Sequence, residues 1–108
     1  MKPTTLSQVE ARRAAGSRLY EEFLSVPDLS AGLYVLDAGA VDPQSPHTED
    51  ELYYVVRGRG RITVGDEIHD VEPGSLVFVG ADVPHRFHDI SERLELLVAF
   101  GPAEGSRR

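Results

Sequence analysis

The sequence contains no cysteine, which excludes disulfide bonds, thiolate metal sites and cysteine nucleophiles. Basic residues are also few, because 11 Lys and Arg stand against 18 Asp and Glu and give a net charge of −7. Nucleic-acid binding needs concentrated positive charge, so this balance argues against it. No apolar run approaches the roughly 20 residues that cross a bilayer, and segment 1–16 lacks the apolar core of a signal peptide. We therefore expect a cytoplasmic protein that binds neither nucleic acid nor membranes.

The beginning of the chain carries the signals of a short helix. The 108 residues, 41% hydrophobic and 27% charged, suit one globular domain with a modest core. Thr5-x-x-Gln8 forms a capping-box pattern, and an overlapping one starts at Ser7. Helix-forming residues follow up to Gly16, a suitable C-terminal stop. These signals predict a helix over about residues 6–15, which we expect to pack on the main body or on a partner chain.

The rest of the chain alternates between short apolar runs and turn residues. The runs predict about eight strands, at about residues 18–26, 32–36, 50–57, 61–64, 67–71, 75–79, 85–90 and 94–100. Gly58-Arg59-Gly60 is interpreted as a tight turn between the third and fourth of them. Short strands at this spacing are typical of an antiparallel sandwich or barrel. The expected fold class is therefore all-β.

The stretch Pro46–Gly58 joins potential metal ligands to an apolar, aromatic strand. In an extended chain, His47, Glu49 and Glu51 point to the same face. The strand has apolar residues on both faces, so we expect both faces to be buried. Charged groups at the edge of such a buried zone are costly unless they are neutralised, and a divalent cation would neutralise them.

The same stretch resembles the first sequence motif of the cupins. His47-x3-Glu51-x6-Gly58 fits the histidine, glutamate and final glycine of that motif, and Gly39 lies near the place of its opening glycine. An ungapped match puts Ser45 where the family has a further histidine. This departure leaves one fewer imidazole than the family's usual metal site contains.

A second segment resembles the other cupin motif. The pattern Gly74-x5-Gly80-x-Asp82-x2-His85-x3-Asp89 has the spacing of that motif and retains its first glycine and its histidine. The family's proline, second glycine and asparagine are replaced by Gly80, Asp82 and Asp89. Together the two motifs make the chain similar to the small, single-domain bacterial cupins of the conserved-barrel type.

The resemblance covers about residues 20–101 and implies an antiparallel jelly-roll β-barrel with a short N-terminal helix. It divides the chain into a helical extension (1–17), the cupin barrel (18–101) and a flexible tail (102–108). Cupins of this size usually pair through sheets and N-terminal segments, so the resemblance also implies a homodimer.

Cupins generally hold one divalent metal with histidines and a glutamate, and the matching positions here are His47, Glu51 and His85. Two imidazoles and a carboxylate suit transition metals, and Fe, Mn, Zn, Ni and Cu all stay open. A regular strand would separate His47 from Glu51 by about 13 Å at the backbone, and from Glu49 by only about 7 Å. Glu51 ranks first because the family bends the chain before this strand, while Glu49 stays a rival or additional ligand. Whether Ser45 joins the site is also open.

Two kinds of function follow from the resemblance. The first is a metal-dependent dioxygenase or isomerase that acts on a small molecule, with Glu49 as a general base if it is not a ligand. The second is a non-catalytic binding or sensor module, with or without a metal, since a fold alone does not decide between these roles. We expect His69 and His88 to lie outside the site. The aromatic residues expected in the core are Tyr34, Tyr53, Phe78 and Phe87, and one or two of them are expected to line the mouth of the barrel.

Overall fold

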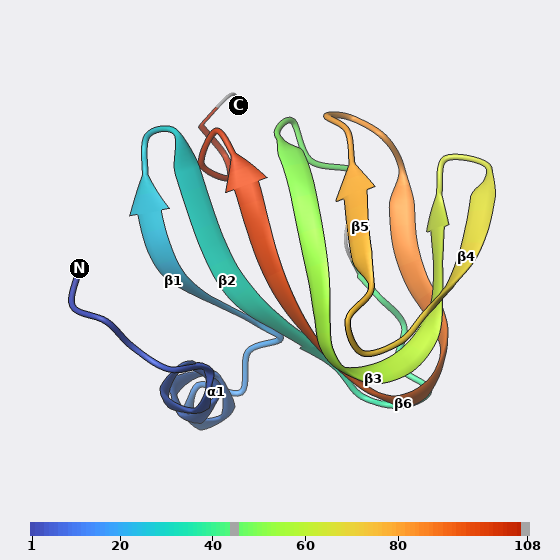
Figure 1. Ribbon diagram of the computed structural model, residues 1–108, viewed down its shortest axis with the longest axis horizontal. Coiled ribbons are helices and arrows are strands. Elements are labelled where there is room, and N and C mark those ends of the chain that lie inside the picture. Colours follow the sequence, from blue (N-terminus) through green and yellow to red (C-terminus); the bar gives the residue numbers. More distant parts are fainter. Residues whose placement is uncertain (44–45, 107–108) are drawn as a thin grey trace.

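The computed structural model describes residues 1–43 and 46–106. In this part of the chain one helix and six strands follow one another (Figure 1): α1 (Leu6–Ala15), β1 (Tyr20–Val26), β2 (Leu29–Leu36), β3 (Asp50–Val64), β4 (Glu67–Val71), β5 (Leu76–Val79) and β6 (His85–Gly101). The expected all-β fold with a short N-terminal helix is confirmed. None of the helical segments in these ranges has the length and apolar character that crossing a membrane requires.

Helix α1 begins at the predicted capping box. The Gln8 N–H donates to the Thr5 hydroxyl at 3.2 Å, and the Gln8 side chain accepts from the Thr5 N–H at the same distance. Val9 is the buried residue of the helix and packs with Leu33 and Val35 of β2, on the outside of the barrel. The helix therefore packs on the main body, which was one of the two expected positions.

The strands form one antiparallel sheet in the order β1-β2-β6-β3-β4, with β5 paired to the first half of β3. β3 and β6 are long and pair with each other from Asp50–Gly101 to Val64–His85. Both curve at the bottom of Figure 1, so their two halves belong to two facing layers. The curled sheet is the jelly-roll barrel that the sequence motifs imply. Because the long strands fold back, the first residues of β3 and of β6 lie across the barrel from each other.

The tight turn predicted at Gly58-Arg59-Gly60 is wrong, because the chain continues there as β3. The pairing of β3 with β6 shifts register three times between Val55 and Arg61. Gly58 has φ +98°, and a Cβ on it would lie 2.1 Å from the Arg93 carbonyl oxygen. Bulges bend and twist a strand, and glycine permits both this φ and this approach. Gly58 and Gly60 therefore mark a bend within one strand. The strands predicted at 50–57 and 61–64 are the two halves of β3, and those predicted at 85–90 and 94–100 are the two halves of β6.

The hydrophobic core fills the inside of the barrel. Its members come from β2, β3, β4, β5 and β6, and include Tyr34, Leu36, Tyr53, Val55, Ile62, Phe87, Leu94, Leu96, Val98 and Phe100. Three of the four aromatic residues expected in the core are buried there. The inward-facing side chains of β3 form one wall of this core, and the candidate metal ligands lie at its edge.

The prediction that β3 is buried on both faces is wrong. Side chains alternate as expected, with Glu51 and Tyr53 buried, but Leu52 is 45% exposed and Tyr54 is 40% exposed. Phe78, which was expected in the core, pairs with Leu52 and is 65% exposed. The reason is that no described segment of the chain covers this part of the outer face of the sheet. β3 therefore carries apolar residues on both faces, although one of these faces is exposed.

Candidate metal centre and adjoining pocket

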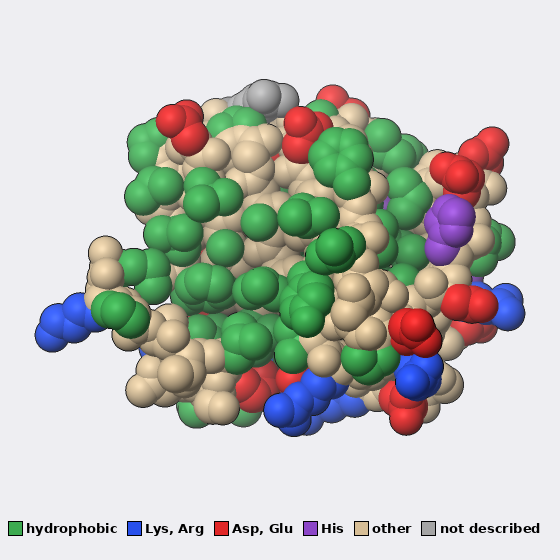
Figure 2. Space-filling view, in the orientation of Figure 1, with side chains coloured by type: hydrophobic (Ala, Val, Ile, Leu, Met, Phe, Trp, Pro, Cys, Tyr) green, Lys and Arg blue, Asp and Glu red, His purple; other side chains and the backbone are tan. Residues whose placement is uncertain are grey.

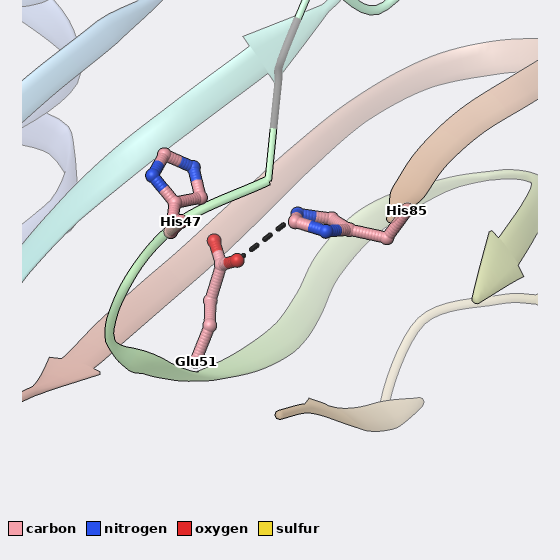
Figure 3. A group of neighbouring side chains, drawn as sticks. All are labelled: His47, Glu51 and His85. Carbon is pink, nitrogen blue, oxygen red and sulfur yellow. Dashed lines mark ion pairs between the residues drawn. The ribbon is translucent and has the colours of Figure 1, made fainter. Parts of the chain in front are cut away.

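Three side chains that the sequence motifs select meet inside the barrel (Figure 3). His47 lies in the loop before β3, Glu51 is the second residue of β3, and His85 begins β6. Each residue offers one potential ligand atom, and these three atoms lie within 4.8 Å of one another. Glu51 and His85 are buried, and His47 is partly buried. The folded-back strands thus bring together groups that are far apart in the sequence.

Glu51 and His85 form a buried ion pair. Glu51 Oε1 lies 3.0 Å from His85 Nε2, and only 1% of each side chain is exposed. His85 Nδ1 donates to the Val83 carbonyl at 3.0 Å, since a carbonyl oxygen can only accept. In the neutral imidazole, Nε2 therefore carries the lone pair, and the Tyr53 hydroxyl lies 3.1 Å from it. The backbone thus orients the ring so that Nε2 faces the centre of the site.

Opposing effects act on the charge of His85. Burial disfavours the imidazolium, but the neighbouring Glu51 carboxylate and the Val83 carbonyl outweigh it and raise the pKa of His85 above its ordinary value. Apart from the Nε2 atom of His85, no group in the described residues forms a hydrogen bond with either oxygen of Glu51. A buried carboxylate in this state is under-satisfied, and a cation would complete its surroundings.

His47 is held by groups from the C-terminal part of the chain. Its Nδ1 lies 3.4 Å from Glu104 Oε2. Its ring packs edge-on against Phe100 with ring centres 4.9 Å apart, and its centre is 5.8 Å from that of His85. Because Nδ1 faces Glu104, Nε2 is the atom of His47 best placed to serve as a ligand. A carboxylate next to a ligating histidine commonly fixes the tautomer and the ring orientation.

Glu104 at the site was not predicted, since residues 102–108 were expected to form a flexible tail. In the structure the Glu104 N–H donates to the Ser30 hydroxyl at 2.8 Å, and Ala103 is buried. The Ala103 N–H donates to the Pro27 carbonyl at 3.2 Å. These contacts depend on residues far away in the chain, so no local sequence signal indicates them.

Glu49 and Ser45 have different outcomes. Glu49 is buried and accepts a hydrogen bond from the Thr48 hydroxyl, and it does not belong to the group of converging ligand atoms. Strand geometry begins only at Asp50, so the alternation argument does not extend back to Glu49. The chain bends before β3, which allows His47 to approach Glu51. Ser45 lies outside the described residues.

The remaining histidines lie away from this group, as expected. His69 is exposed in β4, and the His88 ring is 2.7 Å from the Thr63 hydroxyl. Asp42, a buried carboxylate in the loop before β3, was not predicted from the sequence. It accepts from the Tyr34 hydroxyl at 2.6 Å and from the Phe87 N–H at 2.9 Å. Both its oxygens bind protein donors, so its role is to hold the loop in place.

A pocket of about 220 Å³ opens beside His47. Its wall is largely aromatic and apolar, and Tyr20, Tyr34 and Phe100 contribute to it. His47 and Glu104 add an imidazole and a carboxylate to it. The pocket therefore adjoins the group of potential ligands, and a small molecule in it would lie next to the imidazole of His47.

The model of the Cupin domain family matches residues 32–100. The chain belongs to the cupin family. An uncharacterised protein of Streptomyces coelicolor is 52% identical to this cupin over 104 residues, which are 96% of this chain and 99% of that protein. The family match includes the three converging residues but ends before Glu104.

Solved structures show the same fold. A cupin 2 conserved barrel domain protein from Rhodopseudomonas palustris superposes with a TM-score of 0.70 at 24% identity. The match covers 79% of this chain but only 61% of that protein. An RmlC-like cupin with a double-stranded β-helix fold from Methanocaldococcus jannaschii superposes with a TM-score of 0.71 at 21% identity, covering 78% of this chain and 79% of that one. At these identities the likeness shows the architecture alone.

The residues of this cupin fit a single transition-metal ion. Metal–ligand bonds of about 2.0–2.2 Å place neighbouring ligand atoms on one ion about 3–3.6 Å apart. The converging atoms lie within 4.8 Å of one another, so binding an ion would draw them closer together. The donor set also fits, because imidazole and carboxylate ligands suit iron, manganese and their neighbours. Because His85 is the one close partner of the Glu51 carboxylate among the described residues, a cation would complete its surroundings.

Proposed function

We propose that this cupin binds one divalent transition-metal ion through His47, Glu51 and His85. The convergence of three potential ligand atoms around the buried carboxylate of Glu51 carries the proposal. Two imidazoles and one carboxylate leave further coordination positions for a substrate or for oxygen. Iron and manganese suit this set well, and zinc, nickel and copper are the other candidates.

A bound ion of this kind supplies Lewis acidity and a template for orienting a substrate. The protein supplies the positioning. Val83 fixes the imidazole of His85 through Nδ1, and burial holds Glu51 beside it. The largely apolar wall that includes Phe100 offers a packing surface for an apolar substrate in the pocket beside His47. The pocket and the ligand group share His47.

The function that this arrangement supports best is that of a metal-dependent enzyme of the dioxygenase or isomerase type acting on a small molecule. Glu49 is the proposed general base, because it is a buried carboxylate close in the chain to Glu51 and outside the converging group. Replacement by glutamine would remove the base while keeping the shape of the side chain.

The alternative is a binding or sensor module that holds a small molecule without converting it. The first cupin motif has Ser45 where the family has a histidine, and this departure favours the alternative, including a metal-free form. Turnover separates the two roles. A metal-loaded protein that retains a pocket ligand unchanged acts as a binding module, whereas conversion of that ligand identifies an enzyme.

The metal proposal is tested by His85→Ala. Wild-type protein purified without chelators should contain about one transition-metal ion per chain by elemental mass spectrometry, and the variant should contain almost none. His69→Ala is the matched control, because His69 is an exposed imidazole in β4 and should leave metal content unchanged. Circular dichroism checks that each variant retains the barrel. Equal metal content in wild type and His85→Ala would refute the ligand assignment.

We also propose that the protein forms a homodimer through the outer face of its sheet. Hydrophobic side chains cover much of the face made by β1, β2, β6, β3 and β5 (Figure 2). Leu76 and Phe78 are 69% and 65% exposed on β5, next to the half-exposed Leu52 and Tyr54 of β3. Apolar patches of this kind mark interaction sites, and a two-fold axis would pair the face with itself. The expected cytoplasmic location stays a prediction.

A further inference from the structure

The Tyr20 hydroxyl is a buried polar group with an unusual position. Tyr20 begins β1, and its ring lies edge-on to Tyr34 and Phe100, with ring centres 6.3 and 6.5 Å away. A Cβ on Gly32 would lie 2.4 Å from the Tyr20 hydroxyl oxygen, so the ring passes directly over this glycine. Gly32 pairs with Val98 of β6, which lines the pocket beside His47. Tyr20 itself contributes to the wall of that pocket, and its hydroxyl oxygen lies within this wall with almost no accessible surface.

Within the described residues, the Tyr20 hydroxyl has no hydrogen-bond partner. Buried polar groups in proteins are nearly always hydrogen-bonded, so an unpartnered one in a pocket wall points to a ligand atom. Burial, followed by the negative charges of Glu104, Glu22 and Glu51, raises the pKa of Tyr20. At neutral pH the phenol is therefore protonated and is a hydrogen-bond donor.

The size and lining of the pocket limit the ligand further. An apolar cavity of about 150 Å³ takes benzene, so a pocket of about 220 Å³ takes one ring with a small substituent. Tyr34, Val98 and Phe100 supply apolar and aromatic contacts. The carboxylate of Glu104 also lines the pocket and disfavours an anion there.

We propose that this pocket binds a small neutral molecule with a single-ring or comparable apolar body and an oxygen that accepts a hydrogen bond from Tyr20. The inference rests on the proposed function, because it names the class of molecule that the metal centre at His47 would meet. The apolar body packs between Tyr34 and Phe100, and the acceptor oxygen is a carbonyl or a hydroxyl. Nothing in this recognition requires the metal itself.

The test uses the full chain freed of metal by a chelator, so its outcome does not depend on the metal proposal. Three probes of similar size are titrated and followed by NMR: acetophenone with a neutral acceptor oxygen, isopropylbenzene without one, and benzoate as an anion. Acetophenone should bind most tightly. Tyr20→Phe keeps the ring and should weaken acetophenone binding about three- to tenfold, while isopropylbenzene binding is unchanged. Tyr54→Phe, which alters an exposed tyrosine outside the pocket, should change neither.

Three results would overturn the inference: no binding of acetophenone, equal acetophenone affinity in wild type and Tyr20→Phe, or tighter binding of benzoate than of acetophenone. Each of these can occur while His85→Ala still abolishes metal uptake. Conversely, a protein without metal that binds acetophenone through Tyr20 would support the pocket assignment and refute only the metal proposal.

Discussion

At the scale of single residues, the pair Glu51–His85 makes a contribution to stability that depends on pH. The pKa of His85 in the folded protein is raised above the ordinary value of 6.5. A group whose pKa is higher in the folded than in the unfolded state stabilises the folded protein. This contribution is fully present below the unfolded-state pKa and is lost as pH rises through the folded-state pKa. In metal-free protein, we expect Glu51→Gln to lower the free energy of unfolding by about 1.5–3 kcal/mol at about pH 5.5, the range for hydrogen bonds to charged groups. The loss should become smaller at about pH 9, because His85 loses its proton as pH rises through its folded pKa.

Urea unfolding at the two pH values, with a chelator present, measures this difference. Glu67→Gln is the matched control, because its carboxylate lies 3.6 Å from the exposed imidazole of His69. Exposed ion pairs contribute little, so the control should lose no measurable stability at either pH. A Glu51→Gln loss that is the same at acidic and basic pH would contradict the assigned pairing.

The three converging residues could be predicted because the spacing of short motifs survives in the sequence. The tertiary partners could not. Glu104 contacts His47 because Ser30 holds the backbone of residue 104, and Tyr20 reaches the pocket because Gly32 has no side chain. Such contacts follow from chain segments that meet only after folding. Alternation in an extended chain places Glu49 and Glu51 on the same face, so it could not exclude Glu49 as a metal ligand. In the structure β3 begins only at residue 50, and the alternation does not reach Glu49.

At the scale of elements, the bend in β3 determines where its first residues lie. Gly58 has φ +98°, and its Cα faces the backbone of β6 at Arg93. We expect Gly58→Ala to lower the free energy of unfolding by at least about 3 kcal/mol, because it adds left-handed strain to a steric clash with the backbone. The change should also weaken metal uptake, since the bend brings the two ends of the site together. Urea unfolding and elemental analysis measure the two effects.

Gly65→Ala is the control for this prediction. Gly65 has φ +60° in the turn between β3 and β4, but a Cβ there would meet no atom within 4 Å. Its replacement should cost only the left-handed strain, about 1–2 kcal/mol, and leave metal uptake intact. Equal losses from the two glycine variants would mean that the close approach to Arg93 is unimportant. The sequence indicated a special backbone at Gly58 but could not distinguish a turn from a bend inside a long strand.

At the scale of the whole molecule, the barrel could be predicted because its turns and apolar alternation are local features. The exposure of each sheet face could not, since it depends on what covers that face. Leu52, Tyr54 and Phe78 satisfy every local criterion for a buried strand, yet they lie on the open side of the sheet. Helix α1 covers only the part of this side near Leu33 and Val35. The rest of the face is where we expect the second copy.

Phe78→Asp tests this expectation, because a carboxylate at the centre of an apolar interface would be desolvated without a partner. Light scattering after size exclusion at about 100 µM should give twice the chain mass for wild type and the mass of one chain for the variant. Phe78 is 65% exposed in the single chain, so the substitution should leave the barrel folded. Val41→Asp introduces the same charge at a loop residue that is 78% exposed, and this control should stay dimeric. A monomeric wild type, or a Phe78→Asp variant that still pairs, would exclude this face as the dimer interface.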